Sequence, residues 1–173
     1  MIALSSIETT RNETSGVRLD HLFTCKVGFQ LPPDAIGATP DGAQVSFNLT
    51  GGEATGPRLR GTLRPIGSDW LTVRPDGTGV LDLRIAIETD DGALIYAPYQ
   101  GTLDHGPYGY ERAVRGTLFI EAAPFQIAPR FQSTDPDYQW LNRLRCIGLG
   151  QIYPERGEAR CAVYAIREKD NEA

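Results

Sequence analysis

A regular alternation of apolar and polar side chains over residues 80–89 is the feature that most limits how this chain can fold. Four apolar residues there alternate with four residues that are mostly charged: Leu81, Leu83, Ile85 and Ile87 against Asp82, Arg84, Ala86 and Glu88. Successive side chains of a strand point to opposite faces, so this period of two predicts a strand. The Asp90-Asp91-Gly92 that follows is typical of a tight hairpin turn. We therefore expect Ala93–Leu103 to return as the antiparallel partner strand.

Strand patterns of this kind recur along the chain at intervals of roughly ten residues. Further strands are predicted at 17–29, 45–50, 58–63, 69–74, 117–127, 143–152 and 159–166. The Gly51-Gly52 pair is expected to end the second of these nine strands, at 45–50. Little helix is predicted: about one turn within 104–116, and a short helix or turn at 138–142. Such spacing indicates an all-β fold, and we predict a single antiparallel, up-and-down (lipocalin-like) β-barrel, because closure removes exposed strand edges.

Composition limits the domain organisation and several classes of function. A chain of 173 residues with 40% hydrophobic content is the size of one domain. We expect a flexible N-terminal segment at 1–16, the barrel domain at 17–167 and a polar tail at 168–173. The net charge of −5 argues against a nucleic-acid partner, and no apolar run has the roughly 20 residues of a membrane span. The first residues lack a basic start followed by an apolar stretch, so a cytoplasmic location is expected.

The residue types that bind metals and cofactors are scarce. The chain has three cysteines, Cys25, Cys146 and Cys161, and two histidines. No two cysteines have a Cys-x-x-Cys spacing, and each lies in an apolar, strand-like run, so we expect buried free thiols. A structural zinc site needs three or four suitable ligands, and no Gly-rich nucleotide motif lies in the right context. We therefore expect neither a metal nor a cofactor.

Several short motifs, taken in order, resemble one known family. They are Thr50–Gly52, Gly56–Gly61, Asp69–Trp70, Arg74–Gly77, Leu81–Arg84, Thr89–Tyr96, Ala128–Phe131 and Tyr138–Arg143. In this order the chain resembles the DUF3237 (UPF0311) family of uncharacterised bacterial and fungal proteins, from about residue 17 to residue 167. The resemblance implies a small antiparallel β-barrel, in agreement with the strand pattern. It implies no general activity.

Asp82 and Arg84 are the first candidates for chemistry, because they share one face of a strand. If that face lies outside, they form a solvated pair of little energetic value. If it lines the barrel interior, the confined Asp82 carboxylate is a candidate base and Arg84 a holder of an anionic oxygen. The resemblance favours the interior more than the residue pattern alone does, because the family motif contains both residues. Tyr96, on the partner strand, is the candidate general acid; otherwise it is a buried phenol with a backbone partner.

Asp69, Trp70 and His105 are further candidates. Asp69 is either a turn cap or a second carboxylate at the barrel mouth, and Trp70 is either a core residue or a stacking wall. His105 lies in a loop rich in Gly and Pro, where functional residues are common, although a single loop histidine is often simply exposed. The remaining predicted substrate-binding residues are Arg60, Phe131, Trp140 and Asn142.

Two functions fit these residues. The first is a cofactor-independent enzyme of the isomerase, cyclase or lyase type, which acts on a small, partly aromatic or polyketide-like metabolite by acid–base chemistry in the barrel interior. The second is a non-catalytic carrier of a small hydrophobic ligand. An enzyme should show ionisable groups that converge in the interior, whereas a carrier should be almost wholly apolar there. Both functions require a small-molecule partner, and the sequence leaves open whether the protein forms a homo-oligomer.

Overall fold

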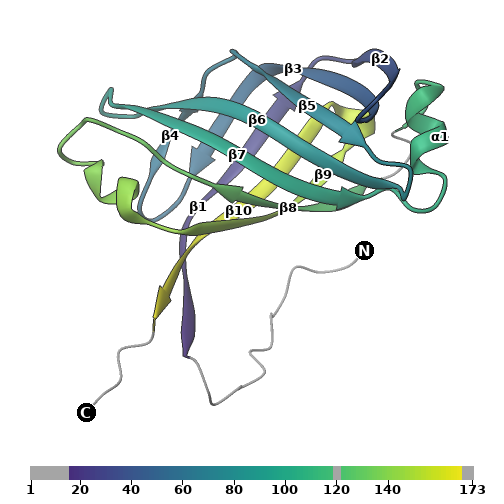
Figure 1. The fold of residues 1–173 in the computed structure, drawn as a ribbon. Coiled ribbons are helices and arrows are strands. Elements are labelled where there is room, and N and C mark those ends of the chain that lie inside the picture. The colour runs from purple at the N-terminus through teal and green to yellow at the C-terminus, as the bar shows by residue number, and fades with distance from the viewer. Residues whose placement is uncertain (1–15, 119–121, 169–173) are drawn as a thin grey trace.

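The structure, a computed structural model, describes residues 16–118 and 122–168 (Figure 1). The predicted flexible segment and polar tail therefore lie outside the described residues, apart from Gly16 and Glu168. The strands are β1 (Val17–Phe29), β2 (Asp34–Thr39), β3 (Gly42–Thr55), β4 (Arg60–Leu63), β5 (Ser68–Val73), β6 (Thr78–Thr89), β7 (Leu94–Asp104), β8 (Ala123–Pro129), β9 (Cys146–Tyr153) and β10 (Glu158–Glu168). The helices are α1 (Gly109–Val114) and two short 3₁₀ segments, η1 (Gln139–Arg143) and η2 (Pro154–Arg156).

The strands form one antiparallel sheet that closes on itself. From β5 to β10 each strand pairs with the next along the chain, and β10 then pairs with β1. The ring closes where β1 also pairs with β3, from Thr24↔Thr55 to Phe29↔Leu49. The prediction of a single all-β barrel is confirmed, and the hairpin at Asp90-Asp91-Gly92 forms as expected, with Gly92 at a φ of 92°.

Strand β3 departs from the predicted pattern, because it does not end at the two glycines. It runs through Gly51 and Gly52, and its two halves have different neighbours. Residues 43–48 pair with β5 and residues 42–46 with β2, whereas residues 52–55 pair with β4 and residues 49–55 lie along β1. The glycines let β3 turn from one pair of neighbours to the other without leaving the sheet. Strand β2, which the sequence pattern did not predict, is the extra strand that makes the barrel depart from simple up-and-down order.

Two other predicted elements differ in their bounds. The strand predicted at 117–127 corresponds to β8, which runs from Ala123 to Pro129; residues 117, 118 and 122 are not part of a strand, and residues 119–121 lie outside the described residues. The expected helical turns are confirmed as α1 and η1. In Figure 1, α1 and β2 lie at one end of the barrel, and the loop that carries η1 lies at the other.

Alternation along the strands decides which side chains fill the barrel. On β6 the predicted apolar face points inward: Leu83 and Ile87 are 2% and 0% exposed. Its register partners on β5 and β7, such as Leu71 and Ile95, are buried as well. One continuous apolar core therefore fills the interior, as expected for a barrel of about eight strands around the ring.

We expect Gly52→Ala to damage barrel closure. A methyl group at this position would overlap the carbonyl oxygen of Lys26 on β1, so β1 and β3 would have to separate locally. The free energy of unfolding, measured by urea denaturation, should fall by about 2 kcal/mol or more. Glu53→Ala is the matched control, because the Glu53 side chain on the same strand is exposed; it should change stability by less than about 0.5 kcal/mol. Equal effects in both variants would contradict the assignment of Gly52 to closure.

Candidate functional site

The barrel encloses a cavity of about 70 Å³. Most of its lining is aliphatic or aromatic, from all around the ring. Four lining residues carry ionisable groups: Cys25, Asp69, Tyr99 and Cys161. The volume is well below the roughly 300–1,000 Å³ of common small-molecule sites, because Phe and Leu side chains fill most of the interior. The expected room for a whole polyketide-like molecule is therefore absent, and only a small molecule or a small reacting group fits beside these residues.

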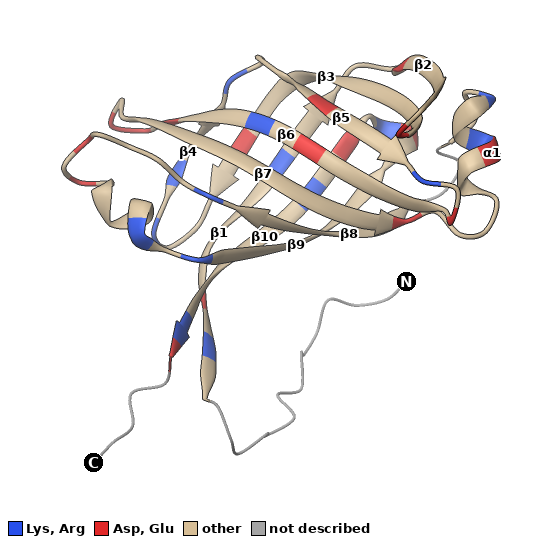
Figure 2. Cartoon of the chain, in the orientation of Figure 1, with Lys and Arg blue, Asp and Glu red and all other residues tan. Residues whose placement is uncertain are grey.

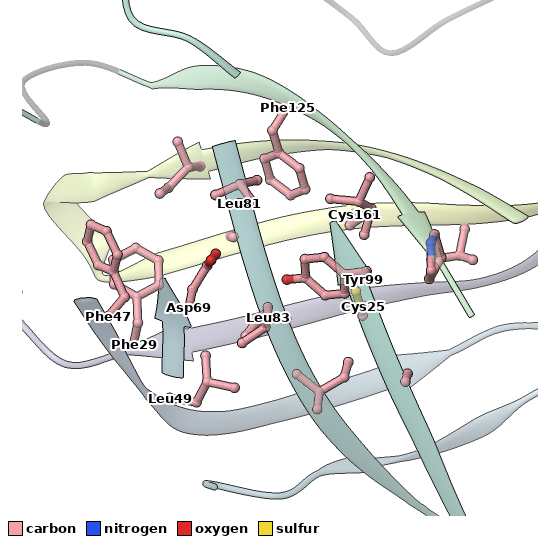
Figure 3. A pocket seen from close by; sticks show the side chains of 18 of the residues that line it. Cys25, Phe29, Phe47, Leu49, Asp69, Leu81, Leu83, Tyr99, Phe125 and Cys161 are labelled. Carbon is pink, nitrogen blue, oxygen red and sulfur yellow. The ribbon is translucent and has the colours of Figure 1, made fainter. Parts of the chain in front are cut away.

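Strand register brings Asp69 and Tyr99 to the same level of the barrel. Leu83 on β6 lies opposite Asp69 on β5 and opposite Tyr99 on β7, so all three side chains point inward in one row. Two strand spacings, about 10 Å, separate the backbones of Asp69 and Tyr99. Their longer side chains extend over this gap: in Figure 3 the Asp69 carboxyl group and the Tyr99 hydroxyl group point toward each other within the cavity. The site is thus an acid–base pair in an apolar cavity.

Burial makes Asp69 a weak acid. Removal of its carboxyl group from water is the largest effect and raises its pKa to about 7. A hydrogen bond from the Asp82 backbone lowers this pKa, and the charge of Asp82 raises it slightly further. Its Oδ1 atom is buried and has no hydrogen-bond partner among the described residues. A carboxyl group in this state exchanges a proton near neutral pH, and one of its oxygens remains available to a ligand.

Tyr99 keeps its proton. Burial raises the pKa of its phenol well above the usual value, and the charge of Asp69 and the two nearby thiols add to this effect. The hydroxyl group is therefore a stable hydrogen-bond donor at neutral pH. The protonation states of Asp69 and Tyr99 therefore differ: the carboxyl group of Asp69 changes charge near pH 7, and the phenol of Tyr99 does not. Acid–base catalysis uses pairs of groups whose pKa values are separated in this way.

Cys25 and Cys161 face each other across β1 and β10. All three cysteines are free and buried, as predicted. A hydrogen bond from Cys161 lowers the pKa of Cys25, and the same contact, together with burial, raises the pKa of Cys161. The two thiols form the wall of the cavity behind Tyr99 (Figure 3).

Four of the predicted site residues lie on the outer face of the barrel. Asp82 and Arg84 occupy the alternate positions of β6, so they point away from Leu83 and Ile85. Trp70 is opposite Asp82 on β5 and 53% exposed, and Tyr96 is 41% exposed. Of the two alternatives left open for Asp82 and Arg84, the outer face is therefore the one that the structure has, and the interior roles predicted for Tyr96 and Trp70 are wrong. The physical reason is the period of two, which turns each of them outward when its apolar neighbours turn inward.

Two further candidates lie away from the cavity. His105 is buried at the α1 end of the barrel, where Arg112 donates a hydrogen bond to its carbonyl oxygen. Burial, together with the charge of Arg112, lowers its pKa to about 4, so its ring is neutral at pH 7. Arg60 is exposed and lies 3.8 Å from the Asp90 carboxylate. Neither residue lines the cavity, so neither can act beside Asp69 in this structure.

The remaining three candidates differ in position. Phe131 lines the cavity and stacks edge-on against Phe23, with a ring separation of 5.7 Å. Trp140 lies outside, under the Arg58 guanidinium, and its indole N–H donates to the Asp137 carbonyl oxygen. The Asn142 amide accepts from the N–H of Ser133 and donates to its carbonyl oxygen, each at 2.8 Å. Of the ten predicted residues, only Asp69 and Phe131 line the cavity.

Tyr99 is the site residue that sequence reasoning missed. Its signal lies in the hairpin register: if the Asp90-Asp91-Gly92 turn sets the pairing of the two strands, Tyr99 is opposite Leu83 and shares its face. Its predicted counterpart, Tyr96, is three positions earlier and so on the other face. Counting from the turn would have distinguished the two tyrosines.

Two larger spaces adjoin the cavity. One, of about 320 Å³, lies at the α1 end and shares Phe29 and Phe47 with the cavity lining. These two rings pack edge-on, 5.3 Å apart, and Phe47 is the register partner of Asp69. The other, of about 610 Å³, lies beside η1 and shares Phe131. Aromatic side chains therefore separate the ionisable pair from both spaces.

Within residues 16–118 and 122–168, no three His, Cys, Asp or Glu side chains converge as metal ligands. No helix within them is long and apolar enough to cross a membrane.

Comparison with known proteins places the fold among described relatives. A family model, "Protein of unknown function (DUF3237)", matches residues 17–166. A UPF0311 protein of Rhodopseudomonas palustris is 29% identical over 136 residues, which cover 78% of this chain and 86% of the relative.

Solved structures agree with this result. A β-barrel-like protein from Acinetobacter baumannii superimposes with a TM-score of 0.74 at 26% identity, over 91% of this chain and 100% of that one. An enzyme from Penicillium herquei superimposes with a TM-score of 0.65 at 21% identity, over 91% and 99% of the two chains. This second likeness shows the fold alone.

The raised pKa of Asp69 predicts a pH-dependent stability. The folded carboxyl group holds its proton up to about pH 7, whereas an unfolded aspartate loses it near pH 3.9. Its contribution to stability is therefore complete in acid and is lost as the pH rises through about 7. Asp69→Asn removes this titration, so the variant should gain roughly 1–3 kcal/mol relative to wild type between about pH 5 and pH 8, measured by urea denaturation.

Asp82→Asn is the matched control for this measurement. Its side chain lies on the outer face one strand away. Raising the pH from about 5 to about 8 should therefore stabilise Asp82→Asn relative to wild type much less than it stabilises Asp69→Asn. A pH-independent difference between Asp69→Asn and wild type would show that the Asp69 carboxyl group is not buried as described.

Proposed function

The chain belongs to the DUF3237 family, and within this fold we propose that it is a cofactor-independent enzyme that moves a proton on a small neutral substrate. The observation that carries the proposal is the convergence of Asp69 and Tyr99 in an otherwise apolar cavity. The predicted enzyme differed from the predicted carrier in having ionisable groups in the interior, and this cavity has them in Asp69, which was predicted, and Tyr99, which was not. That a structural neighbour from Penicillium herquei is an enzyme supports catalysis on this fold by analogy.

The two groups divide the chemistry. Ionised Asp69 takes a proton from a carbon or oxygen of the substrate, and that proton moves to a carboxylate oxygen. The electron pair left behind moves onto a carbonyl oxygen of the substrate, where the Tyr99 hydroxyl group donates a hydrogen bond to it. Asp69 then returns the proton at another atom. This sequence is an isomerisation; it is a cyclisation or an elimination if a bond within the substrate forms or breaks before the proton returns.

The shape of the interior limits the substrate. The reacting group must be small and neutral, because the 70 Å³ cavity is apolar and an anion would face the Asp69 carboxylate. The apolar part of the substrate packs against Phe29 and Phe47, which line both the cavity and the 320 Å³ space at the α1 end. A larger apolar body reaches that space only where these two rings move apart. The substrate class that fits is a small ketone or phenol whose apolar part lies against these two rings.

Proton abstraction is testable without the natural substrate. Ketones from acetone to phenylacetone exchange their α-hydrogens with D₂O when a base acts on them, and ¹H NMR follows the loss of signal. We expect the protein to accelerate this exchange over buffer. Asp69→Asn should lower the accelerated rate by about a hundredfold or more, and Tyr99→Phe by about tenfold or more.

Asp82→Asn again serves as the control, because it removes a carboxylate one strand away but outside the cavity. On the plateau above about pH 8, its exchange rate should stay close to that of wild type. Exchange that survives Asp69→Asn, or that is lost in Asp82→Asn, would contradict the proposal. If the protein binds these ketones but never accelerates their exchange, the carrier function predicted from the apolar lining is the better description.

The pH dependence of the same reaction should follow Asp69. Because only the ionised carboxylate accepts a proton, the rate should rise through about pH 7 and level off above it. The charge of Asp82 is one cause of the raised pKa, so Asp82→Asn should move the midpoint to lower pH while leaving the plateau in place. A rate that falls as the pH rises would assign the reaction to a protonated acid instead.

A further inference from the structure

An open groove of about 610 Å³ lies beside η1, on the outside of the barrel wall that contains Phe131. One side comes from β7 and the other from residues 130–134 together with Asn142, Leu144 and Arg145. The two sides are joined by a bridge between Tyr96 and Gln132, whose backbones exchange hydrogen bonds of 2.9 and 2.8 Å. The groove is thus a fixed feature of the fold, and its volume is that of a small-molecule site.

Hydrogen bonds also hold the rim of this groove. The Asn142 side chain is bonded to both backbone groups of Ser133, and the Ser133 hydroxyl group donates to the Leu94 carbonyl oxygen at 3.0 Å. Segments far apart in the sequence are therefore tied together around the groove. A ligand that enters it does not need to order these segments first, which lowers the entropic cost of binding.

Part of the groove wall is apolar and exposed. Leu94 and Tyr96 are 51% and 41% exposed, although both are large hydrophobic side chains. Single exposed residues of this kind are common, but these two lie in one concave surface. Together they offer a flat apolar or aromatic ligand a surface to pack against.

The charged part of the wall has one sign. Arg130 and Arg145 line the groove, and its lining contains no Asp or Glu. Within the described residues neither guanidinium group forms an ion pair. The chain as a whole carries a net charge of −5, and Figure 2 shows acidic and basic residues interspersed over the barrel strands. This groove is therefore positively charged, because of its two unpaired arginines, although the net charge of the whole chain is negative.

We infer that this groove is a second binding site, which takes a small amphipathic organic anion such as an aromatic carboxylate. Its carboxylate group accepts hydrogen bonds from Arg130 and Arg145, and its apolar body packs on Leu94 and Tyr96. Arginine is suited to this role because its planar fork matches a carboxylate. The inference is independent of the proton transfer proposed for the interior, since the groove shares only Phe131 with the cavity.

A matched pair of ligands tests the charge requirement. 2-Naphthoate and its neutral amide, 2-naphthamide, have nearly the same shape, and isothermal titration calorimetry compares their binding to the full chain. We expect naphthoate to bind with a Kd below about 1 mM and naphthamide to bind at least roughly tenfold more weakly. Arg130→Gln and Arg145→Gln should each weaken naphthoate binding by roughly tenfold and leave naphthamide binding unchanged.

Two further variants show where the ligand binds. Arg143→Gln is the charge-matched control, because Arg143 is exposed on η1 but does not line the groove. It should leave naphthoate binding within about twofold of wild type. Asp69→Asn should also leave it unchanged, because Asp69 lies in the interior. Circular dichroism confirms that each variant is folded.

Several results would overturn the inference. Equal binding of naphthoate and naphthamide would show an apolar surface without anion recognition. An equal loss in Arg143→Gln would show attraction by the general field of this end of the barrel. Loss of naphthoate binding in Asp69→Asn would place the ligand in the interior. Failure of folded wild-type protein to bind naphthoate at about 1 mM, or binding of an acidic peptide alone, would exclude a small-molecule site.

Discussion

Closure of the sheet through β1 is the interaction on which the rest of this structure depends. β1 pairs with β10 along one edge and with β3 along the other, so no strand of the ring keeps a long unpaired edge. A closed ring of strands encloses an interior, and in that interior alternate residues of every strand pack into one apolar core. The approach of β1 to β3 leaves no space for a side chain at Gly52. On the outer face of the sheet, the Glu158 carboxylate of β10 forms an ion pair with Lys26 of β1 across the same seam and a second one with Arg160 on its own strand.

The closed ring also determines which ionisable groups are reactive. Asp69 and Asp82 are neighbours across β5 and β6, yet one is removed from water and the other lies on the outer face. A shift of one residue along either strand would exchange these environments. The chemistry of the site therefore follows from register, because burial raises the pKa of one carboxyl group to the range where it exchanges protons at neutral pH. The same row of the barrel places Tyr99, whose phenol pKa is raised well above its usual value by burial, two strands away from that carboxyl group, with Leu83 between them in register.

The two proposed sites use opposite physical principles. In the interior, a carboxyl group works because water is excluded and few polar atoms compete for it. In the outer groove, two arginines remain charged in contact with solvent, and they recognise an anion through directed hydrogen bonds in addition to charge. Phe131 lies between the two spaces and contributes to both. Phe131 is the last residue of the Ala128–Phe131 motif and follows β8, which ends at Pro129. At this point the chain leaves the barrel wall and forms the rim of the groove.

The sequence by itself determined the class of fold, the hairpin at Asp90-Asp91-Gly92, the alternation of two faces on β6 and the burial of the cysteines. These features depend on local turn chemistry and on a period of two, both of which can be read within one segment. The tertiary structure alone decided that β3 continues through Gly51 and Gly52, that β2 joins the sheet, and that Asp69 of β5 lies in the same row of the barrel as Tyr99 of β7. It also decided that Asp82 and Arg84 lie outside. Each of these depends on how strands far apart in the sequence pair around a closed ring. Such pairing sets the burial of a side chain, but the residues next to that side chain in the sequence do not reveal it.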